Sequence, residues 1–292
     1  MPTSVRFDVA TGVTLVGDCY GDGDAHPVLL LHGGGQTRHA WGGTARVLGA
    51  SGFRAIALDL RGHGDSSWAP DGDYRLVSFA DDLRAVVAEL GQPATVVGAS
   101  LGGLLSLLAE GESDGPLLAA LVMVDVAPRM EPEGVSRIIS FMTDHSVDGF
   151  ASLDEAADAI AAFLPHRPRP KDLSGLSKNL RRSDDGRFRW HWDPRFVHRG
   201  VPDPAFSKQR LDAAAARLEI PTLLVRGRLS DVLSEEAAAE FRRLVPHADY
   251  VDVADAAHMI AGDKNDVFTA AIVEFLNKNG RGKCRGRRAN ER

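Results

Sequence analysis

A chain of 292 residues with 44% hydrophobic and 25% charged residues has the composition of a globular protein, which excludes the fibrous and wholly disordered classes. The formal net charge of −6 argues against a dedicated nucleic-acid binder, because such proteins usually carry a basic face. The longest apolar run, residues 117–124, is far below the ~18 residues that span a bilayer, and the N-terminus lacks a signal-peptide pattern. We therefore expect neither a nucleic acid nor a membrane as partner.

The cysteine content indicates where the protein is located, and the composition of the C-terminal tail indicates whether the tail is folded. Only Cys19 and Cys284 occur, and this usage fits a reducing cytoplasm, which we take as the expected location. Residues 279–292 contain six Lys or Arg, one Glu and no large apolar residue, so we expect a disordered basic tail. A contact between this tail and nucleic acid or an acidic partner is the less favoured alternative.

In chain order, the first predicted elements are residues 5–9 and 14–20, an antiparallel hairpin at one edge of a sheet. Apolar runs then predict strands at residues 28–31, 55–58, 95–97, 121–124, 222–225 and 250–253. Most of these runs are continuous rather than alternating, which is typical of strands buried on both faces of a parallel sheet. Helical patterns lie between them, at residues 40–50, 79–90, 101–109, 234–244 and 266–277. This alternation predicts an α/β class with a doubly wound, mostly parallel sheet.

One long segment interrupts the alternation of strands and helices. Residues 128–218 show no clear strand, and they are rich in proline, arginine and aromatic residues with helical patterns at 153–163 and 205–218. We interpret this segment as a helical cap. The predicted organisation is a core of residues 1–127 and 219–278, a cap of residues 128–218, and the tail of residues 279–292.

A candidate nucleophile lies in the sequence GASLG at residues 98–102, which fits the pattern G-x-S-x-G. The same letters fit residues 111–115, GESDG, so the pattern alone is weak. Only the first copy follows a predicted strand and begins a helix, which is the strand–turn–helix context that a nucleophile elbow requires. Ser100 is therefore the predicted nucleophile, in preference to Ser113 or to a serine that merely caps a helix.

A serine nucleophile needs a base, and the base needs an acid to orient it. His258 follows the last predicted strand by five residues, in a loop at the edge where such sheets place their functional groups. Asp231 follows the preceding strand in a glycine-containing loop, and the order Ser, Asp, His is that of α/β-hydrolases. Asp125, directly after residues 122–124, is the alternative acid, but the chain must turn into the cap there. We predict the triad Ser100, His258 and Asp231.

An oxyanion hole needs two backbone N–H donors. Leu101, directly after the nucleophile, supplies one, and the sequence HGGG at residues 32–35 follows a predicted strand and supplies the other. We predict the amides of Gly34 and Leu101. Neither phosphate-binding pattern, G-x-G-x-x-G or G-x-x-x-x-G-K-[ST], occurs, and no cofactor is expected.

These motifs together resemble the α/β-hydrolase superfamily over residues 5–277. The shared features are LHGGG at residues 31–35 followed by Trp41, DLRGHGDS at 59–66, GASLGG at 98–103, and the loops of Asp231 and His258. The nearest branch comprises small bacterial proteins described as cofactor-free haloperoxidases, esterases, enol-lactonases and C–C bond hydrolases. The resemblance implies the α/β-hydrolase fold and a hydrolase that carries a helical cap.

The resemblance has two departures. Ala257 precedes the predicted base where the family often has glycine, and Leu101 follows the serine where haloperoxidase-like members usually have methionine. The second departure argues against perhydrolase activity. Ser100 also argues against epoxide hydrolases and haloalkane dehalogenases, which use an aspartate nucleophile.

The favoured function is hydrolysis of a carboxylic ester, lactone or thioester through an acyl-enzyme on Ser100. A cofactor-free C–C bond hydrolase, lyase, oxygenase or haloperoxidase is the alternative, and a non-catalytic ligand receptor is a third hypothesis that a complete triad disfavours. The natural substrate, the pathway and the oligomeric state do not follow from the sequence.

The expected partner is a small-molecule substrate that is apolar and of medium size. We predict that Gly35, Trp41, Trp190 and Trp192 contact this substrate. We also predict that arginines of the cap bind a carboxylate group on the substrate; these are Arg181, Arg182, Arg187, Arg189 and Arg195. The segment that contains Trp190 and Trp192 would then be a pocket wall, with cap core as the alternative. No metal site is predicted, because His63 and Asp65 are better explained by a loop held by its own hydrogen bonds.

Overall fold

The computed structural model describes residues 1–163, 169, 173, 175–198, 203, 206–254, 256–258 and 265–279. The predicted tail, with Cys284, falls almost entirely outside these residues. Within them, eight strands form one sheet in the order β1-β2-β4-β3-β5-β6-β9-β10. The strands are β1 (Thr3–Ala10), β2 (Val13–Tyr20), β3 (Pro27–Leu31), β4 (Arg54–Leu58), β5 (Ala94–Ala99), β6 (Leu118–Val124), β9 (Thr222–Gly227) and β10 (Asp249–Val253).

The pairing directions confirm the predicted doubly wound sheet. β1 and β2 form an antiparallel hairpin at one edge, and β2 is antiparallel to β4. All pairs from β4 to β10 are parallel. The carboxyl ends of the parallel strands therefore meet at one edge of the sheet, where ligands bind in such folds.

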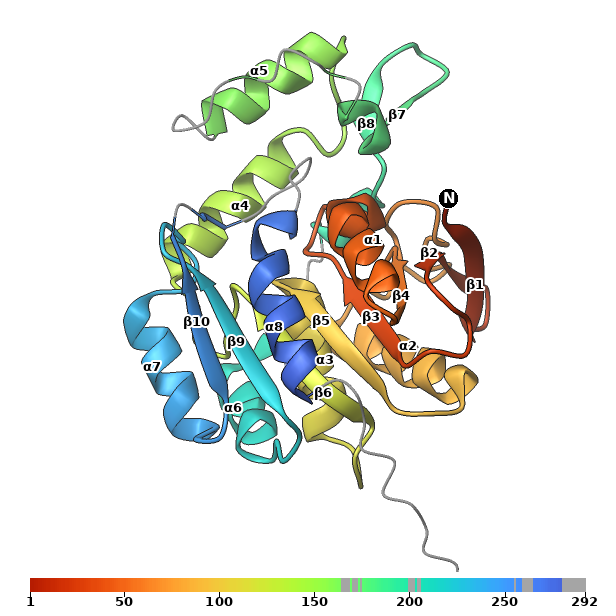
Figure 1. The fold of residues 1–292 in the computed structure, drawn as a ribbon. Helices are drawn as coiled ribbons and strands as arrows, with labels where there is room; N and C mark the ends of the chain where they lie inside the picture. Colours follow the sequence, from red (N-terminus) through yellow and green to blue (C-terminus); the bar gives the residue numbers. More distant parts are fainter. Residues whose placement is uncertain are drawn as a thin grey trace, which may run out of the picture.

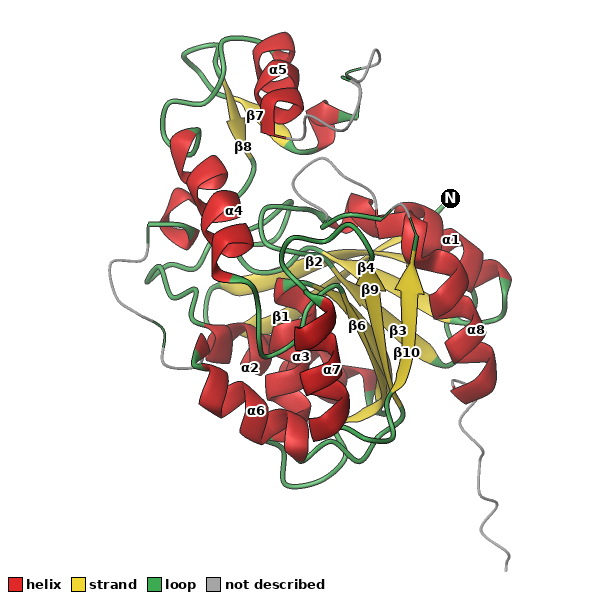
Figure 2. Ribbon diagram, turned by 90° about the vertical axis from the view of Figure 1, so that its left-hand side faces the viewer, coloured by secondary structure: helices red, strands yellow, loops and turns green. Residues whose placement is uncertain are grey.

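Helices cover both faces of the sheet, as Figure 2 shows. One face carries α1 (Gly42–Ala50) and α8 (Thr269–Asn279), and the other carries α2 (Leu76–Leu90), α3 (Leu101–Gly111), α6 (Lys208–Ala216) and α7 (Glu235–Leu244). Alternate residues of one strand enter different cores: Val28 and Leu30 pack with α1 and α8, while Leu29 and Leu31 pack on the opposite face. This two-sided burial explains the continuous apolar runs.

The insertion between β6 and β9 stands above the carboxyl edge of the sheet in Figure 1. It contains α4 (Pro132–Asp144), α5 (Leu153–Phe163) and an antiparallel hairpin of β7 (Leu180–Arg182) and β8 (Phe188–Trp190). The hairpin corrects the expectation that residues 128–218 contain no strand. Each of its strands is three residues long and rich in arginine, so no alternating pattern is visible in the sequence.

The structure also differs from the predicted end of the cap. α6 packs against α3 on one face of the sheet. The two helices are so close that a Cβ added to Gly111 would lie 2.6 Å from Cα of Ala214. The helix predicted at residues 205–218 therefore belongs to the core layer, and the chain rejoins the core before Lys208. Short 3-10 helices complete the described elements: η1 (Arg38–Trp41), η2 (Leu176–Lys178), η3 (Pro194–Phe196) and η5 (Asn265–Phe268).

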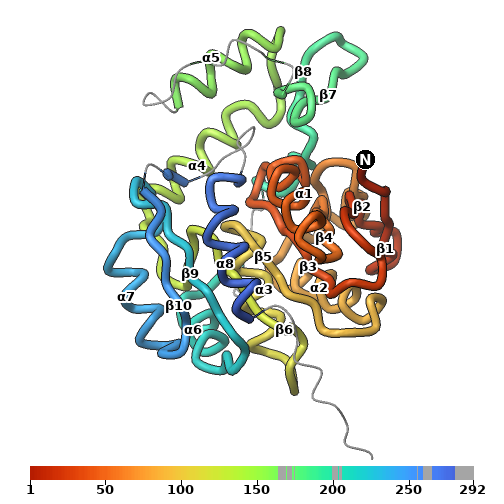
Figure 3. Tube along the Cα trace, in the orientation of Figure 1, coloured from red at the N-terminus to blue at the C-terminus, as the bar shows by residue number. Residues whose placement is uncertain are grey.

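The tube in Figure 3 follows the chain from the N-terminal edge hairpin, through the insertion, to α8, which lies on the same face of the sheet as α1. In the part of the chain that the structure describes, no helix is long and apolar enough to cross a membrane. The cytoplasmic location expected from the cysteine content stays a prediction.

Candidate active site

Ser100 occupies the sharp turn between β5 and α3. Its φ of +46° is a conformation that residues with side chains rarely adopt, and its amide donates to the carbonyl of Val124 on β6 at 3.1 Å. The turn needs glycine at Gly102, because a Cβ there would lie 2.6 Å from the carbonyl oxygen of Leu31. This is the predicted strand–turn–helix geometry. The second copy of the pattern, residues 111–115, begins at the last residue of α3 and continues into a turn, with no strand before it.

The structure joins His258 to Asp125. The Nδ1 atom of His258 lies 2.7 Å from Oδ2 of Asp125, and both side chains are buried. Asp125 has a φ of +54°, which turns its carboxylate away from the strand direction of β6. Its Oδ1 accepts from the amide of Gly227 at 2.8 Å, and its Oδ2 accepts from the hydroxyl of Ser230 at 2.7 Å. The carboxylate is thus fixed by three hydrogen bonds.

Asp231 does not contact His258, so this part of the predicted site is wrong. Its carboxylate forms an ion pair with Arg137 of α4 and remains 39% exposed. The reason is the course of the loop after β9, in which Ser230 rather than Asp231 turns toward Asp125. The hydroxyl of Ser230 also accepts from the amides of Val232 and Leu233, which fixes this turn.

The predicted oxyanion loop, residues 32–35, is held by two buried histidines. Nε2 of His32 accepts from the amide of Leu60 at 3.0 Å, so its Nδ1 carries the hydrogen toward the carbonyl of Gly33 at 2.8 Å. Burial lowers the pKa of His32 to about 4, which keeps the ring neutral at pH 7. The amide of Gly35 donates to Nε2 of His63 at 3.1 Å.

Gly34 lies between these fixed residues and lines the same cavity as Ser100, Leu101 and His258. Four residues predicted for the site are therefore together.

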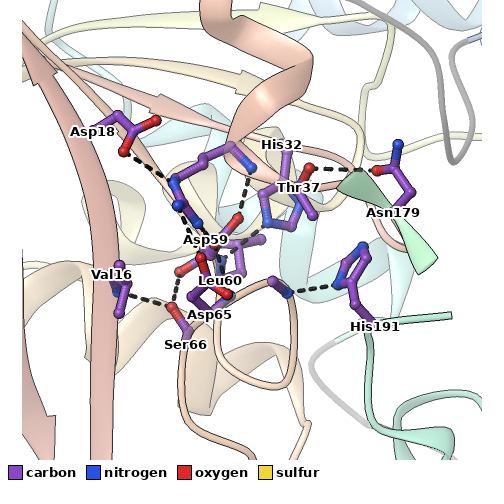
Figure 4. Close-up of polar contacts among 12 residues, drawn as sticks. Val16, Asp18, His32, Thr37, Asp59, Leu60, Asp65, Ser66, Asn179 and His191 are labelled. Atoms are coloured by element: carbon purple, nitrogen blue, oxygen red, sulfur yellow. Dashed lines mark hydrogen bonds and ion pairs between the residues drawn. The ribbon is translucent and has the colours of Figure 1, made fainter. Parts of the chain in front are cut away.

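The neighbouring loop, residues 59–66, is tied to the core through Arg38 and Asp59 (Figure 4). Arg38 forms ion pairs with Asp59, with Asp18 at 3.2 Å and with Asp65 at 2.9 Å. The hydroxyl of Ser66 donates to the carbonyl of Asp59 at 2.7 Å. These bonds agree with the interpretation of His63 and Asp65 as parts of a self-bonded loop. No group of three or more metal-binding side chains occurs in the described part of the chain.

The cavity above Ser100 has a volume of about 460 Å³ and a mainly apolar wall. α4 supplies Val135, Ile138, Ile139 and Met142, and further apolar residues are Leu104, Met130, Phe196, Val197, Phe206 and Val232. The α4 residues were not among those predicted from the sequence to bind substrate. Their spacing of three, four and seven is the signal that could have identified them, because it places them on one helix face.

The predicted substrate-binding residues do not line this cavity. Trp41 is fully buried in the core and donates to the carbonyl of Leu31 at 3.0 Å. Trp190 and Trp192 stack on each other, with ring centroids 4.8 Å apart, and form the core of the insertion. Gly35, within the predicted oxyanion loop, packs against Trp192 and Met142. Cap core, the alternative interpretation, is therefore correct for the two tryptophans.

The arginines of the insertion are also occupied elsewhere. Arg187 and Arg189 bond to backbone carbonyls and to Asp185, and Arg195 pairs with Asp193. Arg181 donates to the carbonyl of Gly64, and Arg182 donates to the carbonyl of Gly186. Within the described residues, no Lys or Arg lines the cavity of Ser100.

Comparison with known proteins places this geometry in context. A family model described as alpha/beta hydrolase fold matches residues 26–264. The chain is 34% identical over 266 residues to esterase Rv0045c of Mycobacterium tuberculosis, covering 87% of this chain and 82% of that esterase. It is 28% identical to non-heme chloroperoxidase CPO-A1 of Kitasatospora aureofaciens, covering 88% and 94% of the two chains. A solved alpha/beta hydrolase of Novosphingobium aromaticivorans matches with a TM-score of 0.79 and 26% identity, covering 95% and 98%.

Proposed function

Because this chain belongs to the α/β-hydrolase fold family and is a hydrolase, we propose that it cleaves a carboxylic ester, thioester or lactone through an acyl-enzyme on Ser100. The observation that carries the proposal is the buried pair of His258 and Asp125, in which His258 lines the same apolar cavity as Ser100. A nucleophile, a base and an oriented acid are the minimum set for covalent acyl transfer.

The proposed first step is attack by Oγ of Ser100 on the carbonyl carbon of the substrate. Since Nδ1 of His258 is bonded to Asp125, Nε2 is the nitrogen that remains to accept the serine proton. The same nitrogen then donates that proton to the leaving group as its bond to the carbonyl carbon breaks. In the second half-reaction it takes a proton from the water that attacks the acyl carbon, and it returns this proton to Oγ of Ser100 as the acyl bond breaks and the acid leaves. Asp125 holds the ring in this tautomer and stabilises the imidazolium that forms.

The proposed oxyanion hole consists of the amides of Leu101 and Gly34. Leu101 is the first residue of α3, so its N–H has no partner within the helix, and Gly34 lines the cavity opposite. Gly33 is held close to the nucleophile, since a Cβ on it would lie 3.3 Å from Cβ of Ser100. Donors fixed in advance stabilise the developing negative charge of the tetrahedral intermediate.

The cavity supports a medium-sized apolar substrate. Its wall is built mainly from aliphatic, methionine and phenylalanine side chains, and burial of apolar surface contributes about 25 cal/mol per Å². Among the described residues, Asp203 is the only acidic residue that lines the cavity wall, and no Lys or Arg lines this wall. A neutral acyl group fits this wall better than the carboxylate-bearing substrate expected from the cap arginines.

Hydrolysis of p-nitrophenyl butyrate and labelling with a fluorophosphonate probe test the proposal. We expect ester turnover and covalent labelling in the natural chain. Both should fall by several powers of ten in Ser100→Ala, as when a triad member is removed. Ser113→Ala is the matched control from the second copy of the motif and should keep both. Equal losses in the two variants, or halide oxidation without ester turnover, would refute the proposal.

A further inference from the structure

A second cavity of about 220 Å³ lies where the insertion meets the core, and it shares no lining residue with the cavity of Ser100. The core contributes Thr37, Arg38, His39, Gly64 and Asp65, and the insertion contributes Ser177, Lys178, Leu180, Arg181 and His191. We propose that this cavity binds one small oxyanion, of the chemical class of inorganic phosphate or a short carboxylate, and that the anion ties the insertion to the core.

The ring hydrogen of His191 lies on the nitrogen that does not contact Gly64. Nδ1 of this residue accepts from the amide of Gly64 at 2.6 Å, so a neutral ring carries its hydrogen on Nε2. The ring is neutral because burial, followed by the nearby His63 and His32 rings, holds its pKa well below the usual range. Figure 4 shows the bonded nitrogen facing the loop of Asp65, while the other nitrogen turns toward the side of Thr37 and Asn179.

The Nε2 atom of His191 is buried and has no hydrogen-bond partner among the described residues. The residue as a whole is only 2% exposed. A buried donor without an acceptor is unfavourable, and native proteins rarely leave one unpaired. This N–H therefore indicates an acceptor that the protein chain does not supply.

The lining of this second cavity carries more cationic than acidic side chains. Lys178, Arg181 and Arg38 line the cavity against a single acidic lining residue, Asp65. Arg38 is balanced by its three carboxylates, and Arg181 reaches Asp65 only at 3.5 Å. Lys178 makes no ion pair within the described part of the chain. Lys178, Arg181 and His191 therefore bring three kinds of donor to the lining: an ammonium, a guanidinium and an imidazole N–H.

The size and the position of this second cavity also suit a bound anion. The volume exceeds the ~30 Å³ that one water molecule takes in the liquid, so the cavity has room for a polyatomic ion. Arg181 and His191 already contact Gly64 through its carbonyl and its amide. An anion between Lys178, His191 and the core would add a bridge at this junction, next to the loop that holds Gly35 through His63.

Calorimetric titration of the full chain with sodium phosphate, and in a second arm with sodium acetate, tests the site at constant ionic strength. We expect saturable binding of one anion per chain, and the tighter arm identifies phosphate or carboxylate as the preferred class. Lys178→Ala should weaken binding about tenfold or more, as expected for loss of one charge-assisted hydrogen bond. Arg182→Ala is the matched control, because Arg182 neighbours Arg181 on β7 but does not line the cavity.

An independent readout is the imidazole N–H signal of His191 in ¹H–¹⁵N spectra, assigned with a His191→Gln variant. Saturation with the anion should shift this signal in the natural chain and in Arg182→Ala, but not in Lys178→Ala at the same concentration. Absence of saturable binding would overturn the proposal and leave a water-filled cavity. Equal weakening in the two variants would also overturn it, because a general effect of net charge would then explain the data.

Discussion

Oδ2 of Asp125 lies 2.7 Å from Nδ1 of His258, and the same carboxylate accepts from the amide of Gly227 and the hydroxyl of Ser230. These three contacts together hold the Asp125 carboxylate in one orientation. A carboxylate in this position fixes the tautomer of the base and stabilises its charged form.

Asp125→Asn should lower kcat on p-nitrophenyl butyrate by about 10³–10⁴, because an amide cannot stabilise the imidazolium as a carboxylate does. Asp231→Asn is the matched control. It removes one exposed ion pair with Arg137, and such pairs contribute only ~0–1 kcal/mol to stability. We expect its kcat to stay within about threefold of the natural chain. If Asp231→Asn is the inactive variant and circular dichroism shows both folded, Asp125 is not the acid.

The sequence predicted the sheet well because its strands have a strong and unambiguous signal. Residues 28–31 and 222–225 are apolar on both faces, and parallel strands covered by helices on both sides require this. The hairpin of β7 and β8 has no such signal. It carries Arg181, Arg182 and Arg189, and its position depends on contacts that are distant in sequence, from Phe188 to Phe150 and from Arg181 to Gly64.

The sharp turn at Ser100 was predictable because a strand, a glycine-flanked turn and a helix follow one another within a few residues. The carboxylate that contacts His258 was not predictable by the same means. β6 and β9 are neighbours in the sheet, so Asp125 and Asp231 both follow strands next to the loop of His258, and both satisfy the order Ser, Asp, His. The choice depends on the positive φ of Asp125 and on the turn of Ser230, and neither has a local sequence pattern.

Ser230→Ala tests how far the support of Asp125 contributes to catalysis. The change removes the hydroxyl that donates to Asp125 and accepts from Val232 and Leu233. We expect kcat to fall about 10-fold with KM nearly unchanged, since groups that orient a functional ligand commonly contribute 10–100-fold. Ser234→Ala is a suitable control, because Ser234 caps α7 and bonds to Glu131 rather than to Asp125. A loss of stability without a change in kcat would assign Ser230 a structural role only.

Ile139 and Trp192 separate substrate selection from folding. Ile139 lines the cavity from α4 yet is 49% exposed, whereas Trp192 is fully buried away from it. Ile139→Ala should cost about 1 kcal/mol or less in unfolding free energy and raise kcat/KM for octanoate over butyrate esters roughly 3–10-fold. Trp192→Ala should instead cost about 3–5 kcal/mol. Chain-length profiles and urea unfolding of both variants measure this difference. An unchanged profile in Ile139→Ala would remove α4 from the substrate site.

His32 should make the protein less stable in mild acid. Burial lowers its pKa in the folded state from 6.5 to about 4, so between these values the unfolded chain binds a proton that the folded protein does not. The free energy of unfolding therefore rises with pH across this window, by up to ~1.4 kcal/mol per pH unit for His32. Above pH 6.5 the ring is neutral in both the folded and the unfolded chain, so His32 adds no further pH dependence. Protonation of His32 would also break the bond from the amide of Leu60, since Nε2 could no longer accept it.

Urea unfolding at pH 7.0, 6.0 and 5.0 measures this slope in the natural chain and in His32→Gln. Glutamine removes the titrating group, so we expect the variant to be less stable at pH 7.0 but to lose less free energy of unfolding on acidification. Comparing slopes cancels the contributions of the other buried ionisable groups, which are the same in both proteins. Ser234→Ala is the control, because it removes a helix-capping hydroxyl but no titrating group, and it should keep the natural slope. If His32→Gln keeps the natural slope as well, His32 does not titrate on unfolding, and the neutral ring that holds the oxyanion loop has been assigned wrongly.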